Sequence, residues 1–468
     1  MRGSTVEKIN NVSYVDFLKN KSQLKNQNGF YPINMPSFLF DFQKDMVEWA
    51  CLMGRSAMFA DCGLGKTAMQ LVWADNVVHK TNKPVLILTP LAVSYQTVNE
   101  GEKFGIECRR SDDGKIKSKI VVTNYERLHL FSRHDFEGVV CDESGILKHF
   151  SGATQKAVTN FMRKIPYRLL GTATAAPNDY TELGTSSEAL GIMGYMDMLN
   201  RFFRNTQNSS DTKRHWIRTG NRGPQWRFKK HAENPFWRWV CSWSRAIRKP
   251  SDIGYSDDEF ILPPLVEKET IIEASRPMKG KLFIEPARNL REQREERKMT
   301  ITERCEAAAE KVNGNHCAVV WCHLNDEGDL LQKIIPDSIQ VSGKDPEGKR
   351  EDIYKNFING DIRVLVTKPK IAGFGLNLQH CSHMTTFPSH SWEQYYQSTR
   401  RLWRFGQKNT VTVDIITTAG EHAVLSNLQR KAKSAEKMFD NLIANMNNSK
   451  SISTLNMPQK TMEVPAWL

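Results

Sequence analysis

The segment Ala60-Asp61-Cys62-Gly63-Leu64-Gly65-Lys66-Thr67 decides the fold of this chain. It follows an apolar run and opens into Ala68–Val78, whose residues favour a helix. Its glycines let backbone N–H groups close around phosphates, and the start of the helix adds the positive end of its dipole. In such a loop Lys66 reaches the β- and γ-phosphates and the Thr67 hydroxyl holds Mg²⁺. The segment predicts a nucleoside triphosphate site, with a plain glycine turn as the alternative.

Length and composition indicate a globular protein with a polyanionic partner. A chain of 468 residues exceeds one ordinary domain, and 40% hydrophobic with 25% charged residues is typical of globular proteins. The 65 lysines and arginines exceed the 52 aspartates and glutamates by 13, and the pI is about 9.2. This balance favours a nucleic acid over an acidic small substrate.

Cysteine usage and the lack of long apolar runs predict a cytoplasmic protein without a membrane partner. Nine cysteines at irregular spacings do not form a disulfide framework, which favours a reducing compartment. The sequence has neither a bilayer-spanning run nor an N-terminal signal. Cys317 and Cys322, each beside a histidine, allow a zinc interpretation, but the apolar residues between them favour structural thiols around a strand.

Short apolar runs alternate with helical or polar stretches along the first half of the chain. This pattern predicts a parallel sheet with helices on both faces. The predicted strands include Val85–Leu88, Ile120–Val122, Val139–Cys141 and Leu169-Leu170.

Polar residues follow two of these predicted strands. Asp142 is placed to bind Mg²⁺, and Glu143 to orient or deprotonate an attacking water. The alternative is a pair of solvated turn acids, but together with the glycine loop the pair completes a hydrolytic site. After the next strand, the hydroxyls of Thr172 and Thr174 can link the nucleotide site to another part of the protein.

These motifs, in this order, resemble the motor core of superfamily 2 helicase-like ATPases. They are most similar to the Swi/Snf subfamily of double-stranded DNA translocases, in a compact bacterial or bacteriophage form. The resemblance implies that Gln43 reads adenine, that Gly63 and Gly65 belong to the ATP loop, and that Thr172 and Thr174 couple the nucleotide site to DNA. It also implies nucleic-acid backbone contacts by Thr89, Thr123 and Asn124.

The chain departs from the family at the acidic motif. Many members have Asp-Glu-Ala-His there, whereas this chain has Asp142-Glu143-Ser144-Gly145. The coupling role of that histidine is therefore absent, or it falls to another residue such as Lys148 or His149.

A basic, tryptophan-rich insertion spans residues 201–249. It holds thirteen lysines and arginines against two acidic residues, and five of the eleven tryptophans. One interpretation is direct nucleic-acid contact through phosphate-binding cations and stacking indoles. The other is a small tryptophan core with solvated arginines around it. For the first interpretation, the expected contacts are Arg222, Arg227, Lys229 and Lys230.

The second half repeats the α/β alternation after an extended connection, Val266–Ile272. Charged helix formers over residues 277–312 predict a protruding, solvated helix or helix pair. The glycine-bearing turn Lys368–Leu378 resembles the family's fifth motif, with Gly373 and Asn377 as nucleic-acid contacts, although Lys368-Pro369 stands where Ser-Thr is usual.

The segment Gln397–Gln407 places Arg401 and Arg404 three residues apart on one helical face. Two guanidiniums from a second domain can clamp a γ-phosphate and stabilise the transferring phosphoryl group. The segment closely resembles the family's sixth motif, including its Gly-Gln ending, and Trp392 matches a tryptophan that the subfamily carries shortly before it. The alternative, a basic helix paired with surface acids, does not account for that ending.

The sequence thus predicts an α/β protein of two RecA-like P-loop lobes with parallel sheets and helical insertions. ATP and Mg²⁺ would bind between the lobes. The predicted function is a DNA translocase on duplex DNA, with two alternatives: a strand-separating DNA or RNA helicase, or a DNA-binding scaffold with a nucleotide switch. The N-terminal arm or the C-terminal tail would be the docking segment for a protein partner. The predicted units are an arm (1–37), a first lobe (38–260), a second lobe (261–446) and a tail (447–468).

Overall fold

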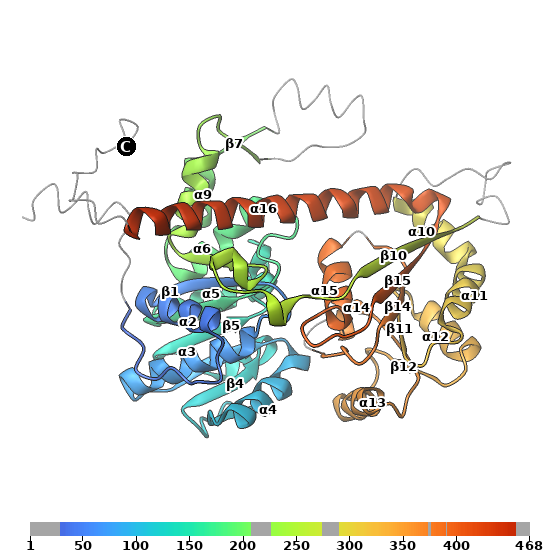
Figure 1. The fold of residues 1–468 in the computed structure, drawn as a ribbon, viewed down its shortest axis with the longest axis horizontal. Helices are drawn as coiled ribbons and strands as arrows, with labels where there is room; N and C mark the ends of the chain where they lie inside the picture. The colour runs from blue at the N-terminus through green and yellow to red at the C-terminus, as the bar shows by residue number, and fades with distance from the viewer. Residues whose placement is uncertain (1–28, 207–225, 274–289, 373–375, 390, 455–468) are drawn as a thin grey trace, which may run out of the picture.

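The structure is a computed structural model that describes residues 29–206, 226–273, 290–372, 376–389 and 391–454. It contains two large sheets that lie side by side, one in each lobe (Figure 1). Neighbouring strands pair in parallel throughout both sheets, which confirms the predicted two-lobe α/β fold. The proposed boundary at residue 260 falls between the last strand of the first sheet and the first strand of the second.

The first sheet has seven strands in the order β3-β4-β2-β5-β6-β1-β9. Its strands are β1 (Arg55–Ala60), β2 (Val85–Thr89), β3 (Cys108–Arg110), β4 (Ile120–Asn124), β5 (Gly138–Asp142), β6 (Tyr167–Gly171) and β9 (Ser244–Ile247). The helices of this lobe are α2 (Asp41–Met53), α3 (Lys66–Thr81), α4 (Ser94–Phe104), α5 (Ala153–Met162), α6 (Leu183–Leu190), α7 (Tyr195–Phe202) and α9 (Glu233–Cys241). Alternate residues of one strand enter separate cores: Phe59 packs with α5 and α6, whereas Met58 packs with α2 and α3. Both faces are therefore buried, as strands without polar alternation require.

The second sheet has six strands in the order β10-β15-β14-β11-β13-β12. Its strands are β10 (Leu265–Ile272), β11 (Ala318–Trp321), β12 (Ser338–Val341), β13 (Val364–Thr367), β14 (His383–Thr386) and β15 (Val411–Thr418). The helices are α10 (Leu290–Met299), α11 (Ile301–Val312), α12 (Asn325–Ile334), α13 (Glu347–Asn359), α14 (Pro369–Ala372), α15 (Trp392–Leu402) and α16 (His422–Thr454). Among the described helices, none is long and apolar enough to cross a membrane.

Of the segment expected to protrude, residues 277–289 lie outside the described residues, and the helix α11 is packed on the second sheet instead. Cys305, Ala308 and Val312 of α11 are fully buried and join the core that contains Val320. Their spacing of three and four residues gives α11 an apolar stripe, so the high charge of the segment describes only its outer face.

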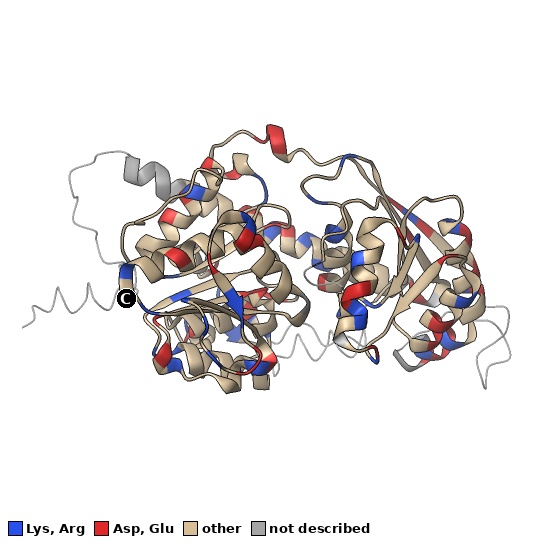
Figure 2. Ribbon diagram, turned by 90° about the horizontal axis from the view of Figure 1, so that it is seen from below, with Lys and Arg blue, Asp and Glu red and all other residues tan. Residues whose placement is uncertain are grey.

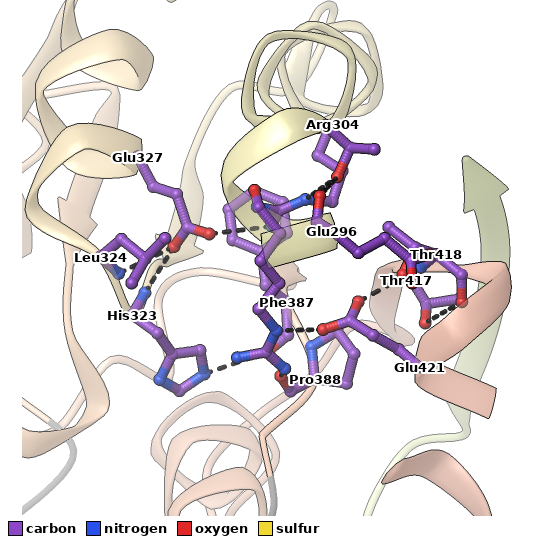
Figure 3. A network of polar contacts seen from close by, with 12 residues as sticks. Glu296, Arg304, His323, Leu324, Glu327, Phe387, Pro388, Thr417, Thr418 and Glu421 are labelled. Atoms are coloured by element: carbon purple, nitrogen blue, oxygen red, sulfur yellow. Dashed lines mark hydrogen bonds and ion pairs between the residues drawn. The ribbon is translucent and has the colours of Figure 1, made fainter. Parts of the chain in front are cut away.

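A buried polar network ties this helix pair to the carboxyl ends of the second sheet's strands (Figure 3). Arg304 donates to the Glu327 carboxylate at 2.8 Å, and both side chains are almost inaccessible to solvent. Arg297 pairs with the buried Glu421 just before α16. Burial raises the pKa of Glu327, but the Arg304 charge and the backbone N–H groups of Leu324 and His323 outweigh it, and the pKa lies below its usual value.

The long helix α16 begins on the second lobe and continues across the first (Figure 1). Leu425 and Leu428 pack with Trp392 of α15, whereas Met438 and Leu442 belong to the first lobe's core. The sequence predicted a closing helix over Glu421–Met446. The structure continues it to Thr454 and attaches its second half to the other lobe.

The tryptophans of the basic insertion build a core. Trp237, Trp239 and Trp243 are buried among the phenylalanines of α7 and α9, with Trp226 packed against their edge. This arrangement favours the core interpretation for these four rings. Trp216 lies outside the described residues.

Candidate nucleotide site and interlobe cleft

The glycine loop lies between β1 and α3, at the carboxyl edge of the first sheet. Gly63 and Gly65 have φ values of +90° and +75°, which side chains other than glycine rarely adopt. Gly65 also has no room for a larger residue, because an ideal Cβ there would lie 2.3 Å from Gln43 Nε2. The loop thus points backbone N–H groups and the start of α3 toward one spot, as phosphate binding requires.

Lys66 and Gln43 both hold the loop. Lys66 Nζ donates to the carbonyl oxygens of Ala60 at 2.9 Å and Asp61 at 3.2 Å. Gln43 Nε2 donates to the Leu64 carbonyl at 2.9 Å, while Gln43 Oε1 accepts from a backbone N–H. Lys66 must leave the two carbonyls to reach a phosphate. Gln43 is 5% exposed and bonded through both amide atoms, so it supports the loop directly, and adenine reading stays a prediction.

The predicted acidic pair follows β5, next to the loop. Asp142 is 5% exposed, and its carboxylate accepts from Gln70 Nε2 at 2.8 Å. Burial, followed by the charge of Glu143, raises the pKa of Asp142 to about 6. Glu143 takes a left-handed conformation at φ 49°, which turns its side chain away from the strand direction. Non-glycine residues in that region are uncommon and often functional.

The second lobe delivers its arginines to this site from α15 and the turn after it. An Arg401 guanidinium nitrogen lies 3.7 Å from Glu143 Oε1 and donates to Gln397 Oε1 at 2.9 Å. Arg404 approaches the loop: its Cβ lies 3.6 Å from where a Cβ of Gly63 would be. Burial and the charge of Arg401 lower the pKa of Arg404. Both predicted arginines are thus brought to the first lobe's site.

A third arginine was missed by sequence reasoning. Arg400 pairs with the Asp61 carboxylate inside the glycine loop and also donates to the Cys62 carbonyl at 3.4 Å. The Tyr396 hydroxyl donates to the same carboxylate. Arg400 lies one helical turn after Tyr396, so the two side chains share a helix face. The acidic residue Asp61 within the glycine loop was the feature of the sequence that could have indicated a cationic partner.

The residues present fit a magnesium nucleotide. Thr67 and Asp142 offer the oxygen ligands that Mg²⁺ prefers. Among the described residues, Arg404 Nε and Gln397 Nε2 are buried without a hydrogen-bond partner. Gln397 lies on α15 and Arg404 in the turn that follows it, near the glycine loop. An anionic ligand bound at the glycine loop would accept hydrogen bonds from these unpaired donors.

Thr172 and Thr174 are buried beside the acidic pair. The backbone N–H of Thr174 donates to Thr172 Oγ1 at 3.0 Å, and the backbone N–H of Thr172 donates to Met58 O in β1 at 3.2 Å. The turn is therefore tied to the strand that leads into the glycine loop, and its proposed coupling role stays a prediction.

A cleft of about 970 Å³ opens between the lobes next to Glu143. The second lobe lines it with Arg350, Lys355, Lys370 and Asn377, and the first lobe with Tyr95 and Tyr125. Figure 2 shows Lys and Arg along the junction of the two lobes. The lining also includes acidic side chains, Glu126 and Glu143 from the first lobe and Glu351 from the second. Its cations and aromatic rings are of the kinds that contact nucleic acid.

The predicted backbone contacts of the first lobe lie beneath this wall. Thr89 and Thr123 are fully buried, and Asn124 is 3% exposed. Thr89 Oγ1 donates to Thr123 O, Thr123 Oγ1 donates to Ser111 O, and Asn124 Oδ1 accepts from Arg127 N. Their side chains therefore support the sheet edge, and the groups that reach the cleft are neighbours such as Tyr95. Gly373 lies outside the described residues.

The cations of the insertion lie elsewhere. Arg227 and Lys230 are exposed at the hairpin of β7 (Phe203–Asn205) and β8 (Trp226–Phe228), and Lys229 Nζ donates to Asn200 O at 2.6 Å. None of these three lines the cleft. Arg222 lies outside the described residues.

Comparison with known proteins agrees with this arrangement. Residues 299–406 match the family model described as the helicase conserved C-terminal domain. This stretch of the second lobe is similar to the C-terminal domain of helicases. This confirms the resemblance to the superfamily 2 helicase-like proteins.

Two further similarities cover most of the chain. A protein designated p41 from Acyrthosiphon pisum secondary endosymbiont phage 1 is 25% identical over 412 residues, which cover 74% of this chain and 85% of that protein. The solved SWI2/SNF2 ATPase core of Sulfolobus solfataricus, in complex with double-stranded DNA, matches 91% of this chain and 97% of its own at 17% identity and a TM-score of 0.41. The phage relative fits the bacteriophage form of the family.

Trp392, which the sequence singled out, has a structural role in the second lobe. This tryptophan starts α15, stacks on Tyr396 with ring centroids 4.8 Å apart, and packs against Leu425 and Leu428 of α16. It thereby fixes the helix that carries the arginines.

Proposed function

We propose that the protein is an ATP-dependent translocase of the Swi/Snf type that moves along duplex DNA. The observation that carries the proposal is the meeting of second-lobe guanidiniums with the first lobe's acidic residue, 3.7 Å between Arg401 and Glu143. Charged side chains contributed by two lobes make a site whose completeness depends on lobe closure.

The proposed chemistry is the hydrolysis of ATP to ADP and phosphate. Glu143 orients or deprotonates the water, Lys66 holds the β- and γ-phosphates, and Arg401 with Arg404 stabilises the charge of the transferring phosphoryl group. Mg²⁺, held by Thr67 and Asp142, would neutralise phosphate charge. The Lys66 ammonium donates to the loop carbonyls of Ala60 and Asp61, so nucleotide binding exchanges those bonds for phosphate contacts.

The proposed track for DNA is the interlobe cleft. Arg350 and Lys355 of α13 and Lys370 of α14 belong to the second lobe, whereas Tyr95 and Tyr125 belong to the first. A strand that touches both walls would shift when the lobes close on ATP and reopen after hydrolysis.

Two features support the Swi/Snf type over the strand-separating type. The sixth motif ends in Gly406-Gln407, and Trp392 precedes it. Gln407 is buried, and its Nε2 donates to the carbonyl oxygens of Gln379 at 2.9 Å and Cys381 at 3.0 Å. It therefore holds the turn after the arginines against the second sheet.

The test is ATP hydrolysis with no nucleic acid, duplex DNA, single-stranded DNA or RNA, each at low and raised salt. We expect duplex DNA to stimulate most, with stimulation that weakens steeply as salt increases. Lys355→Ala should reduce the salt slope of DNA binding by about one, as the loss of one phosphate contact predicts. Lys344, exposed outside the cleft, provides the matched control, Lys344→Ala. Stimulation by single strands or RNA alone would favour a strand-separating helicase, and nucleotide binding without turnover would favour a switch.

A further inference from the structure

Gly145 in the acidic motif has no side chain, and a carboxylate of the second lobe lies next to the space that a side chain would occupy. Gly145 is buried, and an ideal Cβ at this position would lie 3.1 Å from Glu393 Oε1 and 3.3 Å from the Thr174 carbonyl oxygen. Both distances are tighter than most contacts that real Cβ atoms make. The glycine that stands where relatives carry histidine therefore admits a carboxylate from α15 beside the coupling turn.

Glu393 meets a cation of the first lobe beside this space. Its carboxylate pairs with Lys148 Nζ, at the end of the short helix Ser144–Lys148 that follows Glu143. The side chains of Lys148 and Glu393 are 17% and 10% exposed. An ion pair so far removed from solvent is screened much less than a surface pair. His149, the other residue considered for the missing histidine, is exposed.

The pair belongs to a wider polar cluster that joins the lobes. Glu182 accepts from the backbone N–H and side-chain amide of Asn178, just after the coupling turn. Lys431 of α16 donates to Asn178 Oδ1 at 3.0 Å. Burial raises the pKa of Glu182, while the Asn178 hydrogen bonds and the Lys148 charge oppose that rise.

Glu393 also shares a helix face with the arginine that reaches the acidic residue. Glu393, Gln397 and Arg401 lie at four-residue intervals along α15, so their side chains project from one side of the helix. At one end of this row Glu393 meets Lys148, and at the other Arg401 meets Glu143. A shift of α15 must alter both contacts together.

We propose that Lys148 and Glu393 are positioning residues that couple lobe closure to ATP turnover, in place of the missing histidine, and that Gly145 is required to admit Glu393. The inference rests on the proposed ATPase function. The pair holds α15, and hence Arg401, at a defined place relative to Glu143 and the turn of Thr174. It does so only when the lobes are closed.

The test compares turnover with and without duplex DNA in Glu393→Gln, Lys148→Met and the charge-reversed double variant Lys148→Glu/Glu393→Lys. Each single variant should lower DNA-stimulated kcat by about 5–150-fold, the usual range of a coupling between sites, with KM for ATP changed less than about threefold. The double variant should recover most of the loss seen in the worse single variant. Lys148→Arg, which keeps the charge, should retain most of the stimulation.

Two further variants make the test specific. Gly145→Ala should displace Glu393 and reduce stimulation, and adding Glu393→Gln to it should cost little more. The first lobe's surface pair of Lys83 and Glu137 is the matched control, and its reversal, Lys83→Glu/Glu137→Lys, should leave stimulation unchanged.

The possible results distinguish failure of the coupling role from failure of the proposed ATPase function. If duplex DNA stimulates the wild-type enzyme and both single variants equally, the coupling role is refuted while the proposed function stands. A parallel fall in kcat, DNA-free rate and melting temperature without recovery in the double variant would show a structural role and also refute it. If no nucleic acid stimulates the wild-type enzyme, the proposed function fails and the coupling role fails with it.

Discussion

Replacement of Arg400 by methionine should open the two lobes in the absence of nucleotide. Arg400 is 5% exposed, and its pairing with Asp61 joins α15 to the glycine loop. Removal of one partner from a buried ion pair usually costs about 3–5 kcal/mol, because the other charge is left uncompensated. Asp61 keeps the Tyr396 hydroxyl, the Cys62 N–H and a 14% exposed side chain, so we expect the lower end, about 3 kcal/mol.

This free-energy cost should change the equilibrium between closed and open lobes rather than the stability of each lobe, because each lobe has a hydrophobic core of its own. A change of about 3 kcal/mol shifts the ratio of closed to open molecules by roughly 150-fold. Small-angle X-ray scattering of the nucleotide-free protein should therefore report a larger radius of gyration for Arg400→Met than for the wild type. The thermal unfolding midpoints of the individual lobes should stay close to their wild-type values.

Arg430, exposed on α16, supplies the control: Arg430→Met should leave the scattering curve unchanged. The reasoning is refuted if Arg400→Met and the wild type scatter identically. It is equally refuted if the wild type is already open in solution, since the pair could not then hold the lobes together.

Three other predictions concern chemistry, pH and stability. Glu143→Gln should lower kcat by about 10²–10⁴-fold with nucleotide binding retained, whereas Lys66→Ala should abolish turnover; normal DNA-stimulated hydrolysis in either would refute the site. Because the Asp142 pKa is about 6 and Mg²⁺ needs the carboxylate, the affinity for Mg·ATP measured by calorimetry should fall about tenfold per pH unit below 6 and be flat above about pH 7, and a flat profile from pH 5 to 8 would contradict this. Arg304→Met should lower the free energy of unfolding of the second lobe by about 3–5 kcal/mol in urea titrations, and Arg304→Met/Glu327→Leu should recover most of it; a single-variant loss below 1 kcal/mol would rule out the cost expected for an uncompensated buried charge.

The sheets could be predicted from sequence because each buried strand is a short apolar run bounded by polar residues. The apolar runs Val85–Leu88 and Val139–Cys141 form strands β2 and β5, as the sequence predicted. The phosphate loop and the acidic pair were found for a related reason, since their chemistry is set by residues close in sequence. The strand order could not be obtained this way, because it depends on contacts between distant segments.

Predictions that depended on the direction of a side chain were weaker. Thr89 ends β2 and Thr123 lies one residue before the end of β4, and each hydroxyl bonds to a neighbouring backbone carbonyl, so the expected contact of these residues with DNA stays a prediction. A sequence can show that a hydroxyl lies near the end of a strand. It does not show which group accepts the hydrogen bond of that hydroxyl. Similarly, the apolar face of α16 is visible in the spacing of Met438 and Leu442, but nothing local shows that its partner is the other lobe.

The contacts of α15 show why the spacing of residues in the motif predicted only part of the interface between the lobes. Arg401 and Arg404 were recognised by their three-residue spacing, which predicted one helical face, but α15 ends at Leu402 and Arg404 lies in the turn after it. The structure uses two adjacent faces: Glu393, Gln397 and Arg401 follow one row toward the acidic motif, whereas Tyr396 and Arg400 follow another toward Asp61 in the glycine loop. One helix therefore contacts both the loop that holds phosphate and the residue that would activate water. Since the helix is rigid, movement of the second lobe must change both contacts at once, which makes α15 the element through which closure and turnover are linked.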